Sequence, residues 1–288
     1  MSDVRRRSAA RKLLRRPGAL FGLAVIAILV ALAVFGSWIA PLDPNRQNIP
    51  RRLEGPSWDH WLGTDHLGRD LVSRLISGTR IGLAMALPTV SAALLFGLTI
   101  GLAGGYLGGR VDALLLLVVD FLGAFPGLIL ALVLIPLLGT SIPTLIFVLT
   151  FAFMPPYARV TRASVLAVKE RQFVLAERAL GAGSVRIVVA HVLPNIIAPI
   201  LILAAIDIPI VIVAESGLSF LGLGVPPPDA SWGSILFEGF SRVRDAPGPV
   251  AWPAIAIAVT TVAFTMVGES LRSVTDIDIV GARTGRAA

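Results

Sequence analysis

The sequence predicts an all-α membrane protein with six transmembrane helices. Of its 288 residues, 55% are hydrophobic and only 15% are charged, and the mean hydropathy is +0.82. This composition is typical of integral membrane proteins. Several uncharged runs reach the roughly 20 residues that a helix needs to cross a bilayer core, and the alternation of a membrane-barrel strand is missing. Helices satisfy every backbone polar group within lipid, so a helical bundle is predicted.

The six predicted spans cover about residues 18–41, 82–106, 112–137, 143–158, 196–216 and 250–271. Two of the apolar stretches are each interrupted by a single acid, Asp120 in the third span and Asp207 in the fifth. Arginines precede the first apolar run, as they precede the apolar run of a signal peptide. That run is longer than the apolar region of about 7–15 residues in a signal peptide, so it is predicted to be an uncleaved first span.

These spans divide the chain into four segments: a basic tail (1–17), the first helix with its external loop (18–80), the core of the bundle (81–272) and a C-terminal tail (273–288). With six spans, both termini lie on one side of the membrane. The segments on that side carry 17 of the 25 Lys and Arg residues, and the segments on the other side carry 8. Positive residues concentrate in cytoplasmic loops, so both termini are predicted to be cytoplasmic.

The formal net charge of +7 does not predict a nucleic-acid partner. The arginines flank the spans and do not form one basic face with interleaved aromatic residues, which is the pattern that binds nucleic acid. Contact with the membrane lipid accounts for them. The chain has no cysteine, which excludes disulfides and thiolate chemistry.

A polar segment at residues 159–194 separates the fourth and fifth spans. Apolar residues return at helical spacing on one of its faces, at Phe173, Ala176 and Leu180. Gly181 can take a positive φ and end this helix, and Ser184 is a candidate N-cap for a second one. The pattern predicts two short cytoplasmic helices joined in an elbow. A connector that lies on the lipid surface is the alternative from the pattern alone.

The same segment carries a motif, in which nine residues separate Gly181 from "HVLP" at residues 191–194. It resembles the EAA loop of ATP-binding-cassette importer permeases, G-x9-I-x-L-P. Four further stretches support the resemblance: "HWLGTDHLGRDLVSRLISGTRIGL", "VDFLGAFPGLILAL", "AESGLSFLGLGVPPPDASWGSIL" and "GESLRSVTDI". Together they are similar to the second permease subunit of the dipeptide/oligopeptide/nickel branch, over about residues 13–278.

This resemblance implies a permease subunit that carries short peptides or a related small solute across the cytoplasmic membrane. The implied partners are a homologous second permease, two cytoplasmic ATPase subunits and an extracytoplasmic substrate-binding protein. ATP and Mg would be bound by the ATPase subunits, and no cofactor or metal by this chain. The sequence agrees, because no glycine is followed by lysine and a phosphate-binding G-x-x-x-x-G-K-[ST] loop is therefore missing.

The resemblance further implies that residues 160–195 form a coupling elbow that docks on an ATPase subunit. The implied contact residues are Phe173, Ala176, Glu177, Leu180, Gly181, Ala182, Leu193 and Pro194. The family's usual glutamate position holds Leu175 here, and Glu177 lies roughly 200° further around the helix. Ala176, Leu180 and Gly181 are therefore the preferred groove contacts. His191 stands where the family has isoleucine, and "VTDID" at 274–278 replaces its usual "LDPR" ending.

The two acids within spans have competing interpretations, because such residues face a bundle interior or a wet path. Asp120 could line the translocation path or bind a serine, a backbone amide or the companion subunit. Asp207 could line the path or make an interhelical hydrogen bond. On the outer side, the resemblance implies that the Gly- and Pro-rich segment 217–232 meets the binding protein or shapes the outer gate. Its candidate residues are Ser219, Leu221 and Trp232.

His60 and His66 lie six residues apart in a Gly-rich loop, which is poor ligand geometry without further donors, so no metal site is predicted. Trp61 and a helix that begins near Asp70 are instead predicted to lie along the outer membrane interface. Ser216 and Ser219 have no G-x-S-x-G frame, so catalysis is not predicted.

Two other functions stay open from the sequence. A secondary transporter could use Asp120 and Asp207 as proton carriers, but the internal repeats of such a transporter are not detected. A structural subunit could merely anchor a complex. Uptake driven by a pH gradient and indifferent to ATP would favour the first of these.

Overall fold

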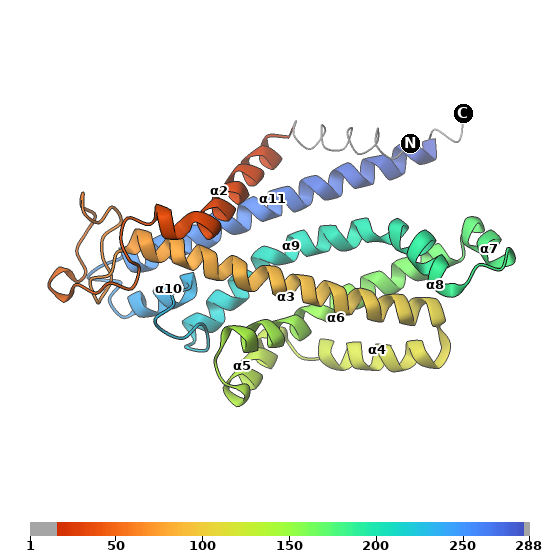
Figure 1. Cartoon of the computed structure of the whole chain (residues 1–288), viewed down its shortest axis with the longest axis horizontal. Coiled ribbons are helices and arrows are strands. Elements are labelled where there is room, and N and C mark those ends of the chain that lie inside the picture. Colours follow the sequence, from red (N-terminus) through yellow and green to blue (C-terminus); the bar gives the residue numbers. More distant parts are fainter. Residues whose placement is uncertain (1–15, 285–288) are drawn as a thin grey trace.

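Helices make up almost all of the described chain (Figure 1). The computed structural model describes the backbone of residues 16–284 and the side chains of residues 16–273. The elements follow in the order α2 (Pro17–Ile39), η1 (Ile49–Arg51), α3 (Leu71–Leu107), α4 (Gly109–Gly123), α5 (Gly127–Leu138), α6 (Ile142–Lys169), α7 (Gln172–Ala179), α8 (Ser184–Arg186), the π-helical turn η2 (Ile187–Val192), α9 (Leu193–Phe220), α10 (Trp232–Phe240) and α11 (Gly248–Thr284).

Five helical stretches are long and apolar enough to cross a membrane: α2, α3, α6, the continuous run from Ser184 to Phe220, and most of α11. The pair α4 and α5 gives a sixth candidate if it is counted as one span. The prediction of an all-helical bundle with about six spans is confirmed. The C-terminal tail predicted from residue 273 continues α11 as far as Thr284, whereas the side chains of 274–278 lie outside the described residues.

The third predicted span, 112–137, is wrong as a straight helix. It is broken after Gly123, and α4 and α5 are bent by 84° at the break. Pro126 explains the break, because proline has no N–H for the helix ladder and disfavours helical geometry in the residue before it. The break places the two halves of this candidate span along different directions.

The helix predicted to lie along the outer interface does not exist as a separate element. It is the first part of α3, which runs without interruption from Leu71 to Leu107. Asp70 caps it, with Oδ2 accepting from the backbone N–H of Ser73 at 2.8 Å. This cap satisfies an N-terminal donor that has no partner within the helix.

Close contact between α3 and α6 depends on glycine. Gly97, Gly101 and Gly105 form a stripe along α3 that faces α6. A Cβ atom on Gly101 would lie 2.5 Å from Cβ of Thr161 and 2.6 Å from the carbonyl oxygen of Ala158. Small residues of this kind let membrane helices approach backbone to backbone, which increases their dispersion contacts.

The first and last spans also lie side by side (Figure 1). Gly22 of α2 faces α11, where an added Cβ would lie 2.5 Å from the carbonyl oxygen of Ala263. Arg16, which precedes α2, donates a hydrogen bond to Ser273 of α11. These contacts attach the peripheral first helix to the bundle.

The bundle has two distinct ends (Figure 1). The loop 40–70 and α10 lie at one of them, called here the loop end. The elbow, defined as residues 170–192 with α7, α8 and η2, lies at the other, called the elbow end. The elbow is shorter than the predicted loop 160–195, because α6 continues to Lys169 and the next span begins at Ser184.

Candidate functional site

The elbow is built around a helix end that requires glycine. Gly181 has a φ of 81°, in the left-handed region where side chains are disfavoured. The N–H of Ala182 donates to the carbonyl of Glu177 at 3.0 Å, and that of Gly181 to the carbonyl of Arg178 at 3.1 Å. These two hydrogen bonds together form a Schellman motif. The predicted role of Gly181 in ending the helix is confirmed.

The second half of the elbow differs from the prediction. Gly183, not Ser184, occupies the N-cap position of α8, and no side chain caps that end. α8 continues through η2 into α9, so the second short helix is the beginning of the fifth span. The elbow therefore contains one separate short helix, α7, which a tight turn connects to a long membrane helix.

One face of the elbow is anchored to the bundle. Val174 is fully buried in an apolar cluster that includes Val168 of α6 and Ile187 and Val192 of η2. The guanidinium of Arg178 lies 5.9 Å from the centre of the Tyr106 ring, within the range of a cation–π contact.

α6 is tied to the same end of α3. Lys169 Nζ, at the last residue of α6, donates to the carbonyl of Gly105 at 3.0 Å. The elbow and the residue that leads into it are both fixed to the last turns of α3. A displacement of the elbow would therefore act on α3.

The other face of the elbow is apolar and exposed. Phe173, Ala176 and Leu180, predicted to share a face, are all exposed, and Leu180 has 82% of its surface accessible. Val185 and Val189 extend the exposed apolar surface into α8 and η2. The remaining predicted contacts vary: Gly181 and Pro194 are exposed, Ala182 is half-buried, and Leu193 packs against the apolar cluster of the bundle.

Glu177, one helical turn after Phe173 on α7, has a partner within the chain. Its Oε1 lies 3.6 Å from Nε2 of His191 in η2. Two of the residues that depart from the family pattern thus meet each other. This contact supports the inference from helix geometry that Glu177 is not one of the preferred groove contacts.

Two Arg–Asp pairs connect α4 to α6. Arg162 binds Asp112 through two hydrogen bonds of 2.6 Å, and Arg159 Nη2 donates to Asp120 Oδ1 at 3.0 Å. The predicted partners of Asp120 did not include an arginine. The signal was present in the sequence as two arginines three residues apart in a largely apolar helix, opposite two acids eight residues apart.

Asp207 is buried in α9, close to α6. Its carboxylate interacts electrostatically with the hydroxyl of the buried Tyr157, without a hydrogen bond of standard geometry. Of the two interpretations of Asp207, this placement favours an interhelical polar contact over a residue of an open path.

The predicted outer residues fall into two groups. Ser219 and Trp232 are buried, and Leu221 is exposed. Trp232 Nε1 donates to the carbonyl of Leu75 at 3.0 Å, which ties α10 to α3. Ser219 donates to the buried Glu215 at 2.6 Å. Sequence analysis missed Glu215, whose signal was an acid at the end of an apolar run.

Ion pairs hold the loop end together. Glu238 of α10 accepts from Arg69 at 2.5 Å and from Arg74 at 3.0 Å, and Arg69 also donates to Asp65 at 2.6 Å. Asp65, His66 and Glu238 offer ligand atoms within 4.8 Å of one another. The two arginines already neutralise both carboxylates, so this arrangement has the character of an ion-pair network and not of a metal centre.

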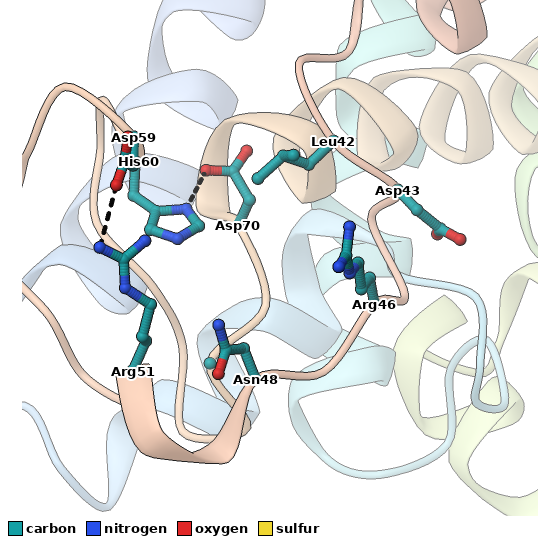
Figure 2. A pocket seen from close by; sticks show the side chains of 9 residues that line it. Leu42, Asp43, Arg46, Asn48, Arg51, Asp59, His60 and Asp70 are labelled. Atoms are coloured by element: carbon teal, nitrogen blue, oxygen red, sulfur yellow. Dashed lines mark hydrogen bonds and ion pairs between the residues drawn. The ribbon is translucent and has the colours of Figure 1, made fainter.

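The loop also encloses a pocket of about 280 Å³ (Figure 2). His60 Nδ1 lies 3.0 Å from Asp70 Oδ1, and Arg51 donates to Asp59 at 2.9 Å. His60 thus lines this pocket, whereas His66 lies beside Asp65 and Glu238 of the ion-pair network. Burial lowers the pKa of His66 below its usual 6.5, since it disfavours the charged imidazolium.

Comparison with known proteins identifies the family. Residues 82–276 match the family described as "Binding-protein-dependent transport system inner membrane component", and residues 5–56 match the "N-terminal TM domain of oligopeptide transport permease C". The chain belongs to the binding-protein-dependent transport permeases. Members of this family are inner-membrane subunits, and ATP hydrolysis belongs to separate subunits, so the permease is a transporter component and not an enzyme.

Relatives match the permease over almost its whole length. The nickel transport system permease protein NikC of Escherichia coli (strain K12) is 38% identical over 90% of this chain and 93% of its own. A putative peptide transport permease of Brucella suis is 39% identical over 93% and 90%, respectively. The dipeptide permease DppC of Alkalihalophilus pseudofirmus is 33% identical over 94% and 89%.

A solved structure shares the fold of the permease. The inward-facing MetNI methionine ABC transporter matches with a TM-score of 0.58 at 19% identity, over 71% of this chain and 97% of that one. The match leaves about three tenths of the permease without an equivalent.

Proposed function

We propose that the permease forms part of an ATP-driven importer of short peptides, together with a homologous second permease, two ATPase subunits and an extracytoplasmic binding protein. The named functions of its relatives support this assignment, because peptide and dipeptide permeases are 33–39% identical to it over nearly the whole chain. Nickel is the second candidate substrate, supported by the match to NikC.

The exposed apolar face of the elbow carries the proposal for coupling. Leu180 is largely accessible beside Phe173 and Ala176, because nothing else in the described chain covers this face. Exposed apolar surface of this kind marks sites of contact with another protein. We assign these three residues to the ATPase interface, with Gly181 setting the turn, whereas Glu177 serves within the chain through His191.

The orientation of the permease follows from this assignment. The elbow end would face the cytoplasm, and both termini would lie on that side, in agreement with the distribution of positive residues. The loop end would face the binding protein. There the exposed Leu221 is the candidate contact, whereas the buried Ser219 and Trp232 would support the outer gate by packing.

Cross-linking tests the proposed interface. The chain has no cysteine of its own, so Leu180→Cys introduces a single thiol on the exposed face and Val174→Cys a matched thiol on the buried face of the same helix. In the complex with its ATPase subunits, a short reagent with a maleimide at one end and a photoreactive benzophenone at the other should join an ATPase subunit to the first variant and not to the second.

Transport by the same complex tests the function. Proteoliposomes with the binding protein outside and ATP inside should accumulate radiolabelled Ala-Ala, and omission of ATP should abolish uptake. Uptake by this chain alone, driven by a pH gradient, would contradict the assignment in favour of a secondary transporter.

A further inference from the structure

The Asp120–Arg159 pair is an exposed ion pair between two helices of the membrane region. The side chains of Arg159 and Asp120 are 51% and 63% accessible, respectively. Asp120 belongs to the broken span formed by α4 and α5, and Arg159 belongs to the span helix α6. Asp120 lies eight residues beyond Asp112, which places it about 12 Å further along α4.

The neighbouring charges are placed differently. Arg162 and Asp112 have accessible fractions of 30% and 16% and share two short hydrogen bonds, so they form a protected tie between α4 and α6. Asp207 is buried against Tyr157. The Asp120–Arg159 pair has a single hydrogen bond and leaves most of both side chains free for another partner.

Lipid is a poor neighbour for this pair. Placing an arginine or aspartate at the centre of a membrane helix costs about 2.5–3.5 kcal/mol on insertion scales, and such residues face a bundle interior or a wet cavity. Gly123 leaves space for the guanidinium of Arg159. A Cβ atom at position 123 would lie 2.7 Å from Arg159 Nη2. The guanidinium therefore occupies a position that any other residue at 123 would restrict.

We propose that Asp120 and Arg159 line the solute pathway and together bind solutes that carry both a free ammonium and a free carboxylate group. The inference rests on the proposed importer function and adds to it the residues that recognise the solute. Arg159 can take a carboxylate in a two-bonded arrangement, and Asp120 can take an ammonium. Each new contact replaces the interaction between the two side chains, so the exchange leaves no charge unpaired.

The chemistry of the pair disfavours a bare divalent cation at this point. Such an ion would be attracted by Asp120 and repelled by the guanidinium of Arg159, which lies 3.0 Å from the carboxylate. Weak binding by exchange also suits transport, in which a solute must enter a site and leave it again. Among the candidate substrates of this family, the pair therefore selects unblocked peptides.

Thiol labelling tests where the pair lies. Asp120→Cys places a single thiol at the pair, and Val118→Cys is the matched control, two residues away and roughly 200° around the same exposed helix. The complex in lipid nanodiscs is treated with the membrane-impermeant reagent methanethiosulfonate ethylsulfonate, and the mass of this chain is followed. We expect labelling at 120 to be at least 10-fold faster than at 118. Equal or slower labelling at 120 would overturn the proposed location, whether lipid or another subunit covers the pair.

Uptake tests what the pair does. The double variant Asp120→Asn/Arg159→Gln removes both charges, and its complex should take up Ala-Ala at least 10-fold more slowly at an unchanged melting midpoint. Asp112→Asn, in the protected tie, should instead lower the melting midpoint. Normal Ala-Ala uptake by the double variant would overturn the proposed recognition. If the unaltered complex takes up no Ala-Ala, the proposed function fails, and the labelling experiment still decides where the pair lies.

Discussion

Glu177 and His191 contact each other across the elbow, with 3.6 Å between Oε1 and Nε2. The contact joins the free helix α7 to the π-helical turn that begins the fifth span. Glu177 lies two residues beyond the family's usual glutamate position and His191 stands where the family has isoleucine, so the contact joins two departures from the family pattern. We therefore propose that the external role of the family's acid does not transfer to Glu177.

Glu177→Gln is expected to have a small effect. Both partners are partly exposed and the imidazole is charged only when it is protonated, so the contact contributes at most the about 0.2–1 kcal/mol of an exposed ion pair to the free energy of unfolding. ATP-dependent uptake should stay within a factor of two of the unaltered complex. Leu180→Asp, which places a charge on the exposed apolar face, should reduce the binding of the ATPase subunits more than 10-fold in a pull-down assay. A larger effect from Glu177→Gln than from Leu180→Asp would reverse the assignment.

Gly181→Val should uncouple ATP hydrolysis from transport. A side chain at a φ of 81° costs roughly 1–3 kcal/mol, and a branched one costs more, so the turn after α7 would change its geometry. The bundle itself would still fold. The control is Gly183→Ala, two residues on, where φ is −66° and no atom lies within 4 Å of the added Cβ. The measurement is the number of solutes imported per ATP hydrolysed; an unchanged ratio in Gly181→Val would count against the elbow.

Gly101→Val should destabilise the bundle. The added atoms would overlap Thr161 and the backbone at Ala158, so α3 and α6 would have to separate, at a cost of about 1–3 kcal/mol or more. Gly82→Ala in the same helix is the control, since its Cβ meets only Ile212, at 4.0 Å. Thermal unfolding in detergent should show a lower midpoint for the first variant and an unchanged or higher one for the second.

Acid should loosen the loop end through His66. Its pKa is lowered in the folded protein, mainly by burial, so the unfolded chain binds this proton more readily. The free energy of unfolding therefore falls as the pH drops from above 6.5 to below it. His66→Gln should reduce the loss of thermal stability between pH 7.5 and pH 5.5. The same pH dependence in both proteins would show that other groups cause it.

The sequence was sufficient for the helical bundle and for most of the spans, because apolar length and charge-free composition determine which segments cross a membrane. The prediction of helix bounds failed where a membrane helix itself contains charged residues. A helix from near Asp70 was predicted to be separate from the span that begins at 82, yet α3 runs without a break from Leu71, where Arg74 is paired with Glu238 and Asp70 caps the helix. Pro126 was visible, but its 84° bend depends on what each half packs against.

Contacts between distant residues could not be read from spacing alone. Asp120 meets Arg159 because α4 packs against α6, and this register is a property of the whole bundle. The elbow was the more predictable site, because a helix, a positive-φ glycine and an exposed face are local features. Burial of Ser219 and Trp232 required knowledge of how α10 packs on α3.

The continuous helix α3 connects the two ends of the permease. It has 37 residues and is therefore about 55 Å long, more than the thickness of a bilayer core. Arg74 near its first turn binds Glu238 at the loop end, and Tyr106 in its last turn lies under Arg178 of the elbow. A helix of this length that tilts by about 10° as a rigid body moves one end by about 10 Å relative to the other. A small rotation imposed at the elbow would thus be enough to open or close the opposite surface.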